Sequence, residues 1–184
     1  MKKITLIFPK KPRTKKSVAL GGRKQILMIL PVMMFMLFSM NIMAQNAIEL
    51  GPALNSLKIT ANQQYNVINS LIYDVQPTVY VQNGMVQSFG NGPAKRVEVS
   101  TNSFDNLYET NPVFSDVEII TVKINNKNDL KMPGLNIQDL SHFTNLKYIL
   151  YLCSINCDPV SINKMFTPEI HDGITIFYQI SIPN

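Results

Sequence analysis

Two stretches, FSDVEIITVKIN at 114–125 and FTNLKYILYLCS at 143–154, carry the same apolar pattern and begin 29 residues apart. The marked positions are separated by three, three, two and three residues in each stretch. They are Phe114, Val117, Ile120, Val122 and Asn125, and then Phe143, Leu146, Ile149, Tyr151 and Ser154. A third stretch, IHDGITIFYQIS, begins 27 residues later and keeps the spacing, with Gly173 at an expected apolar position. We interpret the three stretches as copies of one structural unit.

The residues between the copies indicate short helices. Asn136 followed by Asp139 suits the start of one helix, because both side chains favour a helix N-terminus. Asp158 followed by Pro159 suits the start of another, with proline at the first helical position. A strand, a helix and a second strand in sequence require parallel strands joined by a right-handed crossover. We therefore predict a three-stranded parallel β-α-β-α-β unit, with strands near 117–125, 147–153 and 174–182.

The spacing resembles that of the leucine-rich repeat, L-x-x-L-x-L-x-x-N/C-x-L, over about residues 112–182. The resemblance implies stacked short strands, with the side chains of Asn125, Ser154 and Ser181 bonded to loop backbone inside the stack. Isoleucine, valine, phenylalanine and tyrosine replace most of the leucines, and the last leucine of the pattern is missing from the first two copies. A generic β-α-β-α-β sheet is the alternative.

The first half of the chain lacks this spacing. NQQYNVINSLIYDV has apolar residues at helical intervals, which predicts a helix near 61–73. In TVYVQNGMVQSFG, the Asn83-Gly84 pair lies between two alternating runs and predicts a β-hairpin, and RVEVS predicts a short strand. We predict one α/β domain at 45–184, with a helix and hairpin region at 45–111 and the leucine-rich-repeat-like region at 112–184.

The start of the chain has the pattern of a secretory signal peptide. Residues 1–25 hold nine basic residues and no acidic one, and residues 26–44 are uncharged and mostly apolar. This order predicts a signal peptide at 1–44, cut after Ala44. The alternative is an uncleaved membrane anchor at 26–44, whose 19 residues are long enough to span a bilayer. Either reading predicts an exported domain, secreted, periplasmic or on the cell surface.

Removal of this segment reverses the charge. The whole chain is +5, whereas residues 45–184 hold eight basic and twelve acidic residues, a net charge of −4. A nucleic-acid-binding domain needs a basic patch, and Lys95-Arg96 is the only adjacent basic pair left. We therefore predict no nucleic-acid partner, and contact with a membrane only through 26–44 if that segment stays uncleaved.

Few residues in the chain suggest catalysis, metal binding or a disulfide. Cys153 and Cys157 of an exported chain would form a disulfide if one helical turn brought them together, and otherwise would be two buried thiols. Glu169, His171 and Asp172 are types that do acid–base work, although Asp-Gly is also ordinary turn chemistry. The chain has neither the phosphate-loop spacing nor G-x-S-x-G. We predict no catalytic residue, metal or cofactor.

The outward-facing positions of the three predicted strands are the best candidates for binding. Five of them would form one apolar patch, namely Ile119, Tyr148, Leu150, Leu152 and Phe177. Exposed apolar patches mark interaction sites, but parallel sheets are usually covered on both faces. In that alternative, the N-terminal helix or hairpin covers the patch. We predict an exported, non-enzymatic binding module with a protein or peptide partner; the alternative is a small secreted enzyme using Glu169, His171 and Asp172.

Overall fold

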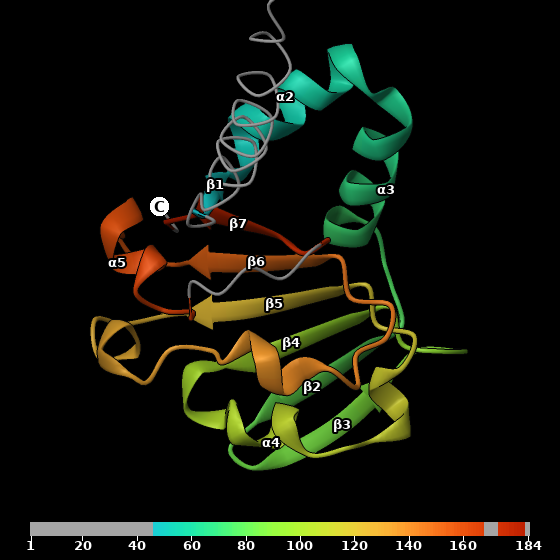
Figure 1. The fold of residues 1–184 in the computed structure, drawn as a ribbon, viewed down its shortest axis with the longest axis vertical. Helices are drawn as coiled ribbons and strands as arrows, with labels where there is room; N and C mark the ends of the chain where they lie inside the picture. Colours follow the sequence, from blue (N-terminus) through green and yellow to red (C-terminus); the bar gives the residue numbers. More distant parts are fainter. Residues whose placement is uncertain (1–45, 168–172, 183–184) are drawn as a thin grey trace, which may run out of the picture. The chain divides into compact units, whose positions relative to one another are not determined.

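The computed structural model describes residues 46–167 and 173–182. The described part is a mixed α/β fold around a sheet of seven strands, with the order β1-β7-β6-β5-β4-β2-β3 (Figure 1). The strands are β1 (Ile48–Glu49), β2 (Thr78–Gln82), β3 (Met85–Phe89), β4 (Arg96–Ser100), β5 (Ile119–Ile124), β6 (Tyr148–Cys153) and β7 (Thr175–Ile180). Neighbouring strands are parallel except β2 and β3, which form an antiparallel hairpin.

The helices of the described residues are short. The α-helices are α2 (Leu50–Thr60), α3 (Asn62–Tyr73), α4 (Asp105–Tyr108) and α5 (Pro159–Asn163). The 3-10 helices are η2 (Thr101–Ser103), η3 (Pro112–Phe114), η4 (Asp129–Lys131) and η5 (Ile137–Leu140). Across the described residues, none of these helices is long and apolar enough to cross a membrane. The predicted signal segment at 1–44 lies outside the described residues.

The predicted parallel arrangement of the last three strands is confirmed. Strands β5, β6 and β7 are neighbours in chain order, and Ile120, Ile149 and Ile176 lie side by side in the register. The copies aligned by their spacing are therefore aligned in the sheet as well. The parallel region is larger than predicted, because β4 pairs with β5 and β2 pairs with β4.

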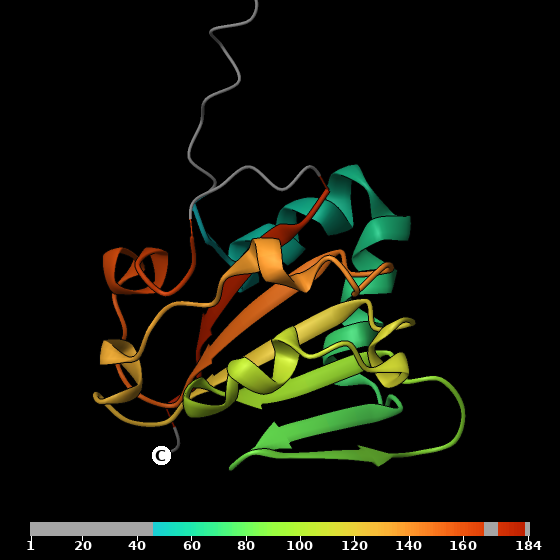
Figure 2. The same ribbon diagram turned by 60° about the horizontal axis from the view of Figure 1, so that its bottom comes forward.

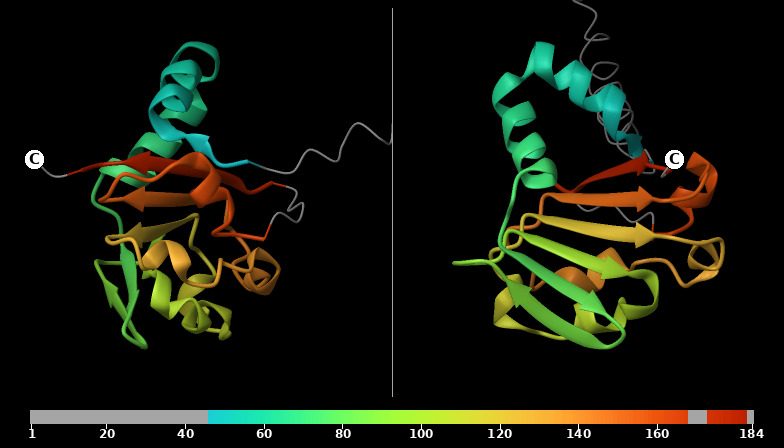
Figure 3. Two further views of the ribbon diagram at one scale, coloured as in Figure 1. Left: turned by 90° about the vertical axis from the view of Figure 1, so that its left-hand side faces the viewer. Right: turned by 180° about the vertical axis from the view of Figure 1, so that it is seen from behind.

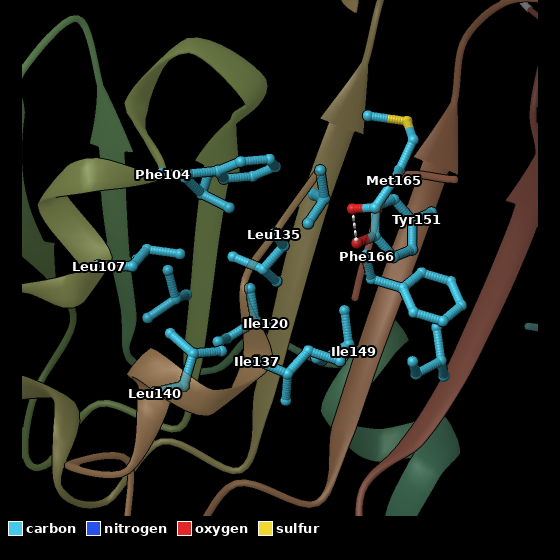
Figure 4. Packing of buried hydrophobic residues seen from close by; sticks show 14 of the residues in the cluster. Phe104, Leu107, Ile120, Leu135, Ile137, Leu140, Ile149, Tyr151, Met165 and Phe166 are labelled. Atoms are coloured by element: carbon cyan, nitrogen blue, oxygen red, sulfur yellow. Dashed lines mark hydrogen bonds between the residues drawn. The ribbon is translucent and has the colours of Figure 1, made fainter. Parts of the chain in front are cut away.

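One face of the sheet, called the crossover face here, packs against the connections between β4 and β7. Figure 4 shows Leu107, Leu135 and Leu140 from these connections above Ile120 and Ile149 of the sheet. All five side chains are buried, with exposed fractions of 3% or less. The larger hydrophobic core of the domain therefore lies between the crossover face and these connections.

A buried hydrogen bond joins this core to the segment that follows α5. The hydroxyl of Tyr151 in β6 donates to the backbone carbonyl of Met165 at 2.9 Å (Figure 4). Burial raises the pKa of the Tyr151 phenol far above its usual value, because the interior disfavours the anion. Tyr151 therefore remains a neutral donor that holds the segment after α5 against the sheet.

The two predicted helix starts are found, but one helix is shorter than expected. The side chain of Asp158 accepts a hydrogen bond from the backbone N–H of Ser161 at 2.9 Å, and Pro159 begins α5. Asn136 caps η5 in the same way, accepting from Gln138. The predicted α-helix at this position is a single 3-10 turn, because the chain turns again by Phe143 to reach β6.

The opposite face of the sheet, called the helix face here, carries α2 and α3. Figure 2 shows both helices on the side of the sheet away from the crossovers. Helix α3 confirms the helix predicted near 61–73. The two helices bury a second, smaller apolar cluster against the sheet. Its buried members are Leu50, Leu54, Ile68 and Leu71 from the helices, and Ile119, Tyr148, Leu150 and Phe177 from the sheet.

The predicted hairpin is also confirmed. Asn83 and Gly84 connect β2 to β3 with φ angles of 52° and 74°, the left-handed values that a type I′ turn requires. Strand β3 is the last strand of the sheet, at the edge remote from β7 (Figure 3). All five of its residues are exposed.

Candidate functional site

The predicted apolar patch is largely covered. Ile119, Tyr148, Leu150 and Phe177 are between 0% and 7% exposed, because α2 and α3 lie on them. The prediction of an open apolar face is therefore wrong for these four residues, and the alternative of a covered face is correct. Leu152, the fifth residue of the patch, is half-buried and lines a hollow together with Ile72 and Tyr73 of α3.

Most residues on the rest of the helix face are polar. Alternate residues of a strand share a face, so the register identifies which side chains lie beside the buried cluster. We call this set the shelf. It consists of Tyr80 in β2, Arg96 and Glu98 in β4, Thr121 and Lys123 in β5, Leu152 in β6 and Gln179 in β7.

A charged group forms the centre of the shelf. The carboxylate of Glu98 lies between Arg96, at 3.6 Å from the guanidinium Nε, and the ammonium of Lys123, which it contacts directly. The side chains of Arg96 and Glu98 are only 16% and 15% exposed, whereas that of Lys123 is 42% exposed. The Lys123 ammonium also lies 5.9 Å from the centre of the Tyr80 ring, within the range of a cation–π contact. The group has a net charge of +1, most accessible at Lys123.

Arg96 also fixes the end of α3 beside the shelf. Its guanidinium donates to the backbone carbonyl of Ile72 at 3.1 Å and of Leu71 at 3.5 Å. The last carbonyls of a helix lack partners within the helix, and a cation at that end is favourable. The contact therefore places the last turn of α3 next to the charged group.

Two hollows adjoin this last turn. The first, of about 250 Å³, lies over the shelf and includes Glu98, Leu152 and Gln179 in its lining. The second, of about 450 Å³, lies towards the hairpin and includes Tyr80 and Phe89. Both are also lined by Ile72, Tyr73 and Arg96. We call them the shelf pocket and the hairpin pocket.

The hairpin pocket has an aromatic wall. The rings of Tyr80 and Phe89 meet edge to face at 5.4 Å. Phe89 and Tyr73 remain 55% and 56% exposed, so both rings present apolar surface to the solvent. These rings and the Arg96–Glu98–Lys123 group offer a ligand both apolar surface and charge.

A second charged group lies where β4, β5 and β6 begin. The carboxylate of Glu118 is 3.1 Å from the Lys95 ammonium and 2.9 Å from that of Lys147. The hydrogen bond from Lys147 lowers the pKa of Glu118, and the same bond raises the pKa of Lys147. The three residues precede β4, β5 and β6. This group therefore ties the starts of three strands together, and we assign it a structural role.

The two cysteines are free thiols. Cys153 ends β6 and Cys157 lies four residues on; both are buried. Of the two alternatives for this pair, the two buried thiols are found, and residues 154–158 form no helical turn. Burial raises the pKa of Cys153, and a hydrogen bond with Cys157 raises it further. A thiol of this kind is a poor nucleophile.

The alternative enzyme site cannot be compared with the structure, because Glu169, His171 and Asp172 lie outside the described residues. Within the described ranges, no three His, Cys, Asp or Glu residues are grouped closely enough to hold a metal ion. His142 lies against Phe143 and Phe114, with ring centres 4.7 and 6.0 Å away, so it packs as an aromatic side chain.

Comparison with known proteins gave no relative. No family model matches the chain, and neither the curated proteins nor the solved structures contain a match. The geometry of the shelf is therefore the guide to function. Sequence reasoning missed Tyr80, Arg96 and Glu98 as site residues, although the alternation of Arg96 and Glu98 with valines in RVEVS already indicates a strand with one polar face.

Proposed function

We propose that the chain is an exported, non-enzymatic binding module whose C-terminal part is leucine-rich-repeat-like, and that its ligand lies on the shelf. The basic and apolar lead at 1–44 supports export. The matched spacing of the three C-terminal copies supports the repeat character. The partner is a protein or peptide, and its contact surface is the part of the helix face that α2 and α3 leave uncovered.

The main support for this proposal is that aromatic residues and an arginine line the uncovered surface. Tyr73, Tyr80, Phe89 and Arg96 line two adjoining hollows, and tyrosine, phenylalanine and arginine are enriched where proteins bind proteins. Tyrosine and arginine also supply a large share of the binding energy at such interfaces. Glu98 and Gln179 supply hydrogen-bonding groups beside these anchors.

The shape of the shelf favours an extended segment of the partner. The shelf crosses five neighbouring strands, from β2 through β4, β5 and β6 to β7. Strands lie about 4.8 Å apart, so the shelf is roughly 19 Å long. An extended chain advances about 3.3 Å per residue, so about six residues of a peptide would cover it.

The charge of the shelf favours an acidic residue near the middle of that segment. Glu98 already has two cationic neighbours, and Lys123 is the most exposed of the three. A carboxylate of the ligand would pair with the Lys123 ammonium while an adjacent aromatic or aliphatic side chain packed on Tyr80. We therefore expect bound peptides to combine an acidic and an apolar residue.

Selection from a displayed library of random peptides, about twelve residues long, tests this proposal on protein produced from the full chain. The best peptides would be synthesised and titrated against three proteins by calorimetry. Lys123→Glu should weaken binding about tenfold or more, because it places a second carboxylate beside Glu98. The control Lys131→Glu makes the same charge change at an exposed position in η4, away from the shelf, and should bind like the parent.

Two results would contradict the proposal. If Lys123→Glu and Lys131→Glu both bind the selected peptides with the affinity of the parent, the shelf is not the contact surface. If no selected peptide binds more tightly than about 1 mM, the partner is not an extended peptide segment.

A further inference from the structure

Strand β3 lies at one edge of the sheet. Because a two-residue turn joins β2 to β3, Gln82 and Met85 form a hydrogen-bonded pair, and so do Tyr80 and Gln87. The backbone groups of the intervening residues, Val86 and Ser88, therefore point away from β2. No other strand of the described residues pairs with this side of β3. The edge offers two N–H groups and two carbonyls to another chain.

The edge lacks the features that normally prevent pairing. Sheet edges are commonly protected by charged residues, proline, bulges or a covering segment. Met85–Phe89 reads MVQSF, with no charge and no proline, and it pairs with β2 without a bulge. Met85, Val86 and Phe89 are 53%, 37% and 55% exposed. This strand therefore combines free backbone groups with exposed apolar side chains.

We propose that β3 pairs with β3 of a second copy of this chain, antiparallel, about a two-fold axis through Gln87. Val86 then lies opposite the partner's Ser88, and their outward backbone groups form about four hydrogen bonds across the axis. The result is one continuous sheet shared by two copies. This contact shares Phe89 with the hairpin pocket, but the backbone pairing does not depend on the proposed function.

Side-chain complementarity indicates a second copy as the occupant. In this register Met85 faces the partner's Phe89 on the helix face, so the two exposed apolar side chains cover each other. Gln87 faces the partner's Gln87, and two amide groups can bond each other as donor and acceptor. The strand thus matches its own sequence when reversed, as a two-fold contact requires.

The size of the contact limits its strength. Five residues at a sheet edge bury much less than the ~800 Å² per partner of a standard interface. The dimer should therefore form and dissociate with concentration. It would place both helix faces on the same side and bring the two hairpin pockets, each lined by Phe89, next to each other.

Cysteine cross-linking tests the register on protein produced from the full chain. Gln87 pairs with itself at a non-hydrogen-bonded position, where the two Cα atoms are about 4.5 Å apart and a disulfide can form. Gln87→Cys should therefore give disulfide-linked dimers under mild oxidation, about tenfold faster than Met85→Cys, which faces the partner's Phe89. Equal rates for the two variants, or no dimer from Gln87→Cys, would overturn the proposed pairing.

Sedimentation velocity over a range of concentrations tests the dimer without added cysteines. The parent should shift from monomer to dimer as its concentration rises. Val86→Lys should raise the dissociation constant about tenfold or more, because charge at a sheet edge opposes pairing. Val160→Lys, at a position on α5 that is 63% exposed, is the matched control and should dimerise like the parent. A parent that stays monomeric, or equal dissociation constants for both variants, would overturn the proposal.

Discussion

Ile149→Ala is expected to lower the free energy of unfolding by about 2–5 kcal/mol, the usual cost of deleting a large side chain from a packed core. Ile149 is fully buried on the crossover face, between Ile120 and Ile176 in the register. Leu150→Ala should have a cost in the same range. Leu150 points to the helix face, where it is 2% exposed beneath α2 and α3. Chemical denaturation of both variants beside the parent measures the two costs.

An exposed position provides the control for this pair. Ile59→Ala changes a side chain of α2 that is 86% exposed, and it should alter stability by less than about 0.5 kcal/mol. A neutral Leu150→Ala beside a costly Ile149→Ala would mean that α2 and α3 do not pack on the sheet. A neutral Ile149→Ala would contradict the register of β6 itself.

Ile68→Asp is expected to cost about 4 kcal/mol or more, because it places an unpaired carboxylate in the apolar layer beneath α3. Ile68 is fully buried and contributes to the same cluster as Tyr148 and Phe177. If α3 detaches from a sheet that stays folded, the cluster becomes exposed and should bind a hydrophobic dye. Denaturation midpoints and dye fluorescence, measured on one sample, separate detachment from complete unfolding.

The neighbouring residue on α3 gives the matched control. Val67 is 40% exposed, so Val67→Asp introduces the same charge into the same helix with water beside it. Its cost should stay at or below about 1 kcal/mol, because valine and aspartate have similar helix propensities and only the partly buried surface of Val67 is lost. Similar costs for Ile68→Asp and Val67→Asp would contradict the packing of α3 on the sheet.

The parallel strands were predictable because a strand that is buried on both faces has mostly apolar side chains. Strand β6 reads YILYLC, an almost unbroken apolar run, as expected for a strand covered on both faces. The repeated spacing then aligned β5, β6 and β7, since residues at equal positions in successive crossovers fall side by side. The leucine-rich-repeat-like character of this region stays a prediction.

The partners of the first half were not predictable in the same way. Asn83-Gly84 predicts that β2 and β3 form a hairpin, but a turn carries no information about which strand lies on the other side of β2. Helix α2 begins with Leu50, Gly51 and Pro52, and glycine and proline are poor indicators of a helix. Its position depends on burial of Leu50 and Leu54 against a sheet formed by residues far along the chain.

The shelf was missed for a related reason. Sequence reasoning identified which residues of β5, β6 and β7 face away from the crossovers, but it did not place β4 and β2 beside them. The group formed by Arg96, Glu98 and Lys123 exists only because β4 and β5 are paired in register. The alternation within RVEVS indicated that β4 has one polar face. Only the pairing of β4 with β5 places Lys123 beside that face.

Methyl NMR can locate a bound peptide on the protein, and we expect the peptide to lie on the shelf. Leu152 lines the shelf pocket, whereas Ile162 of α5 is fully buried on the crossover side. On addition of a peptide selected against the protein, the methyl signals of Leu152 should shift or broaden, and those of Ile162 should stay in place. Unchanged Leu152 signals at a saturating peptide concentration, with shifts confined to methyl groups of the crossover face, would contradict this expectation.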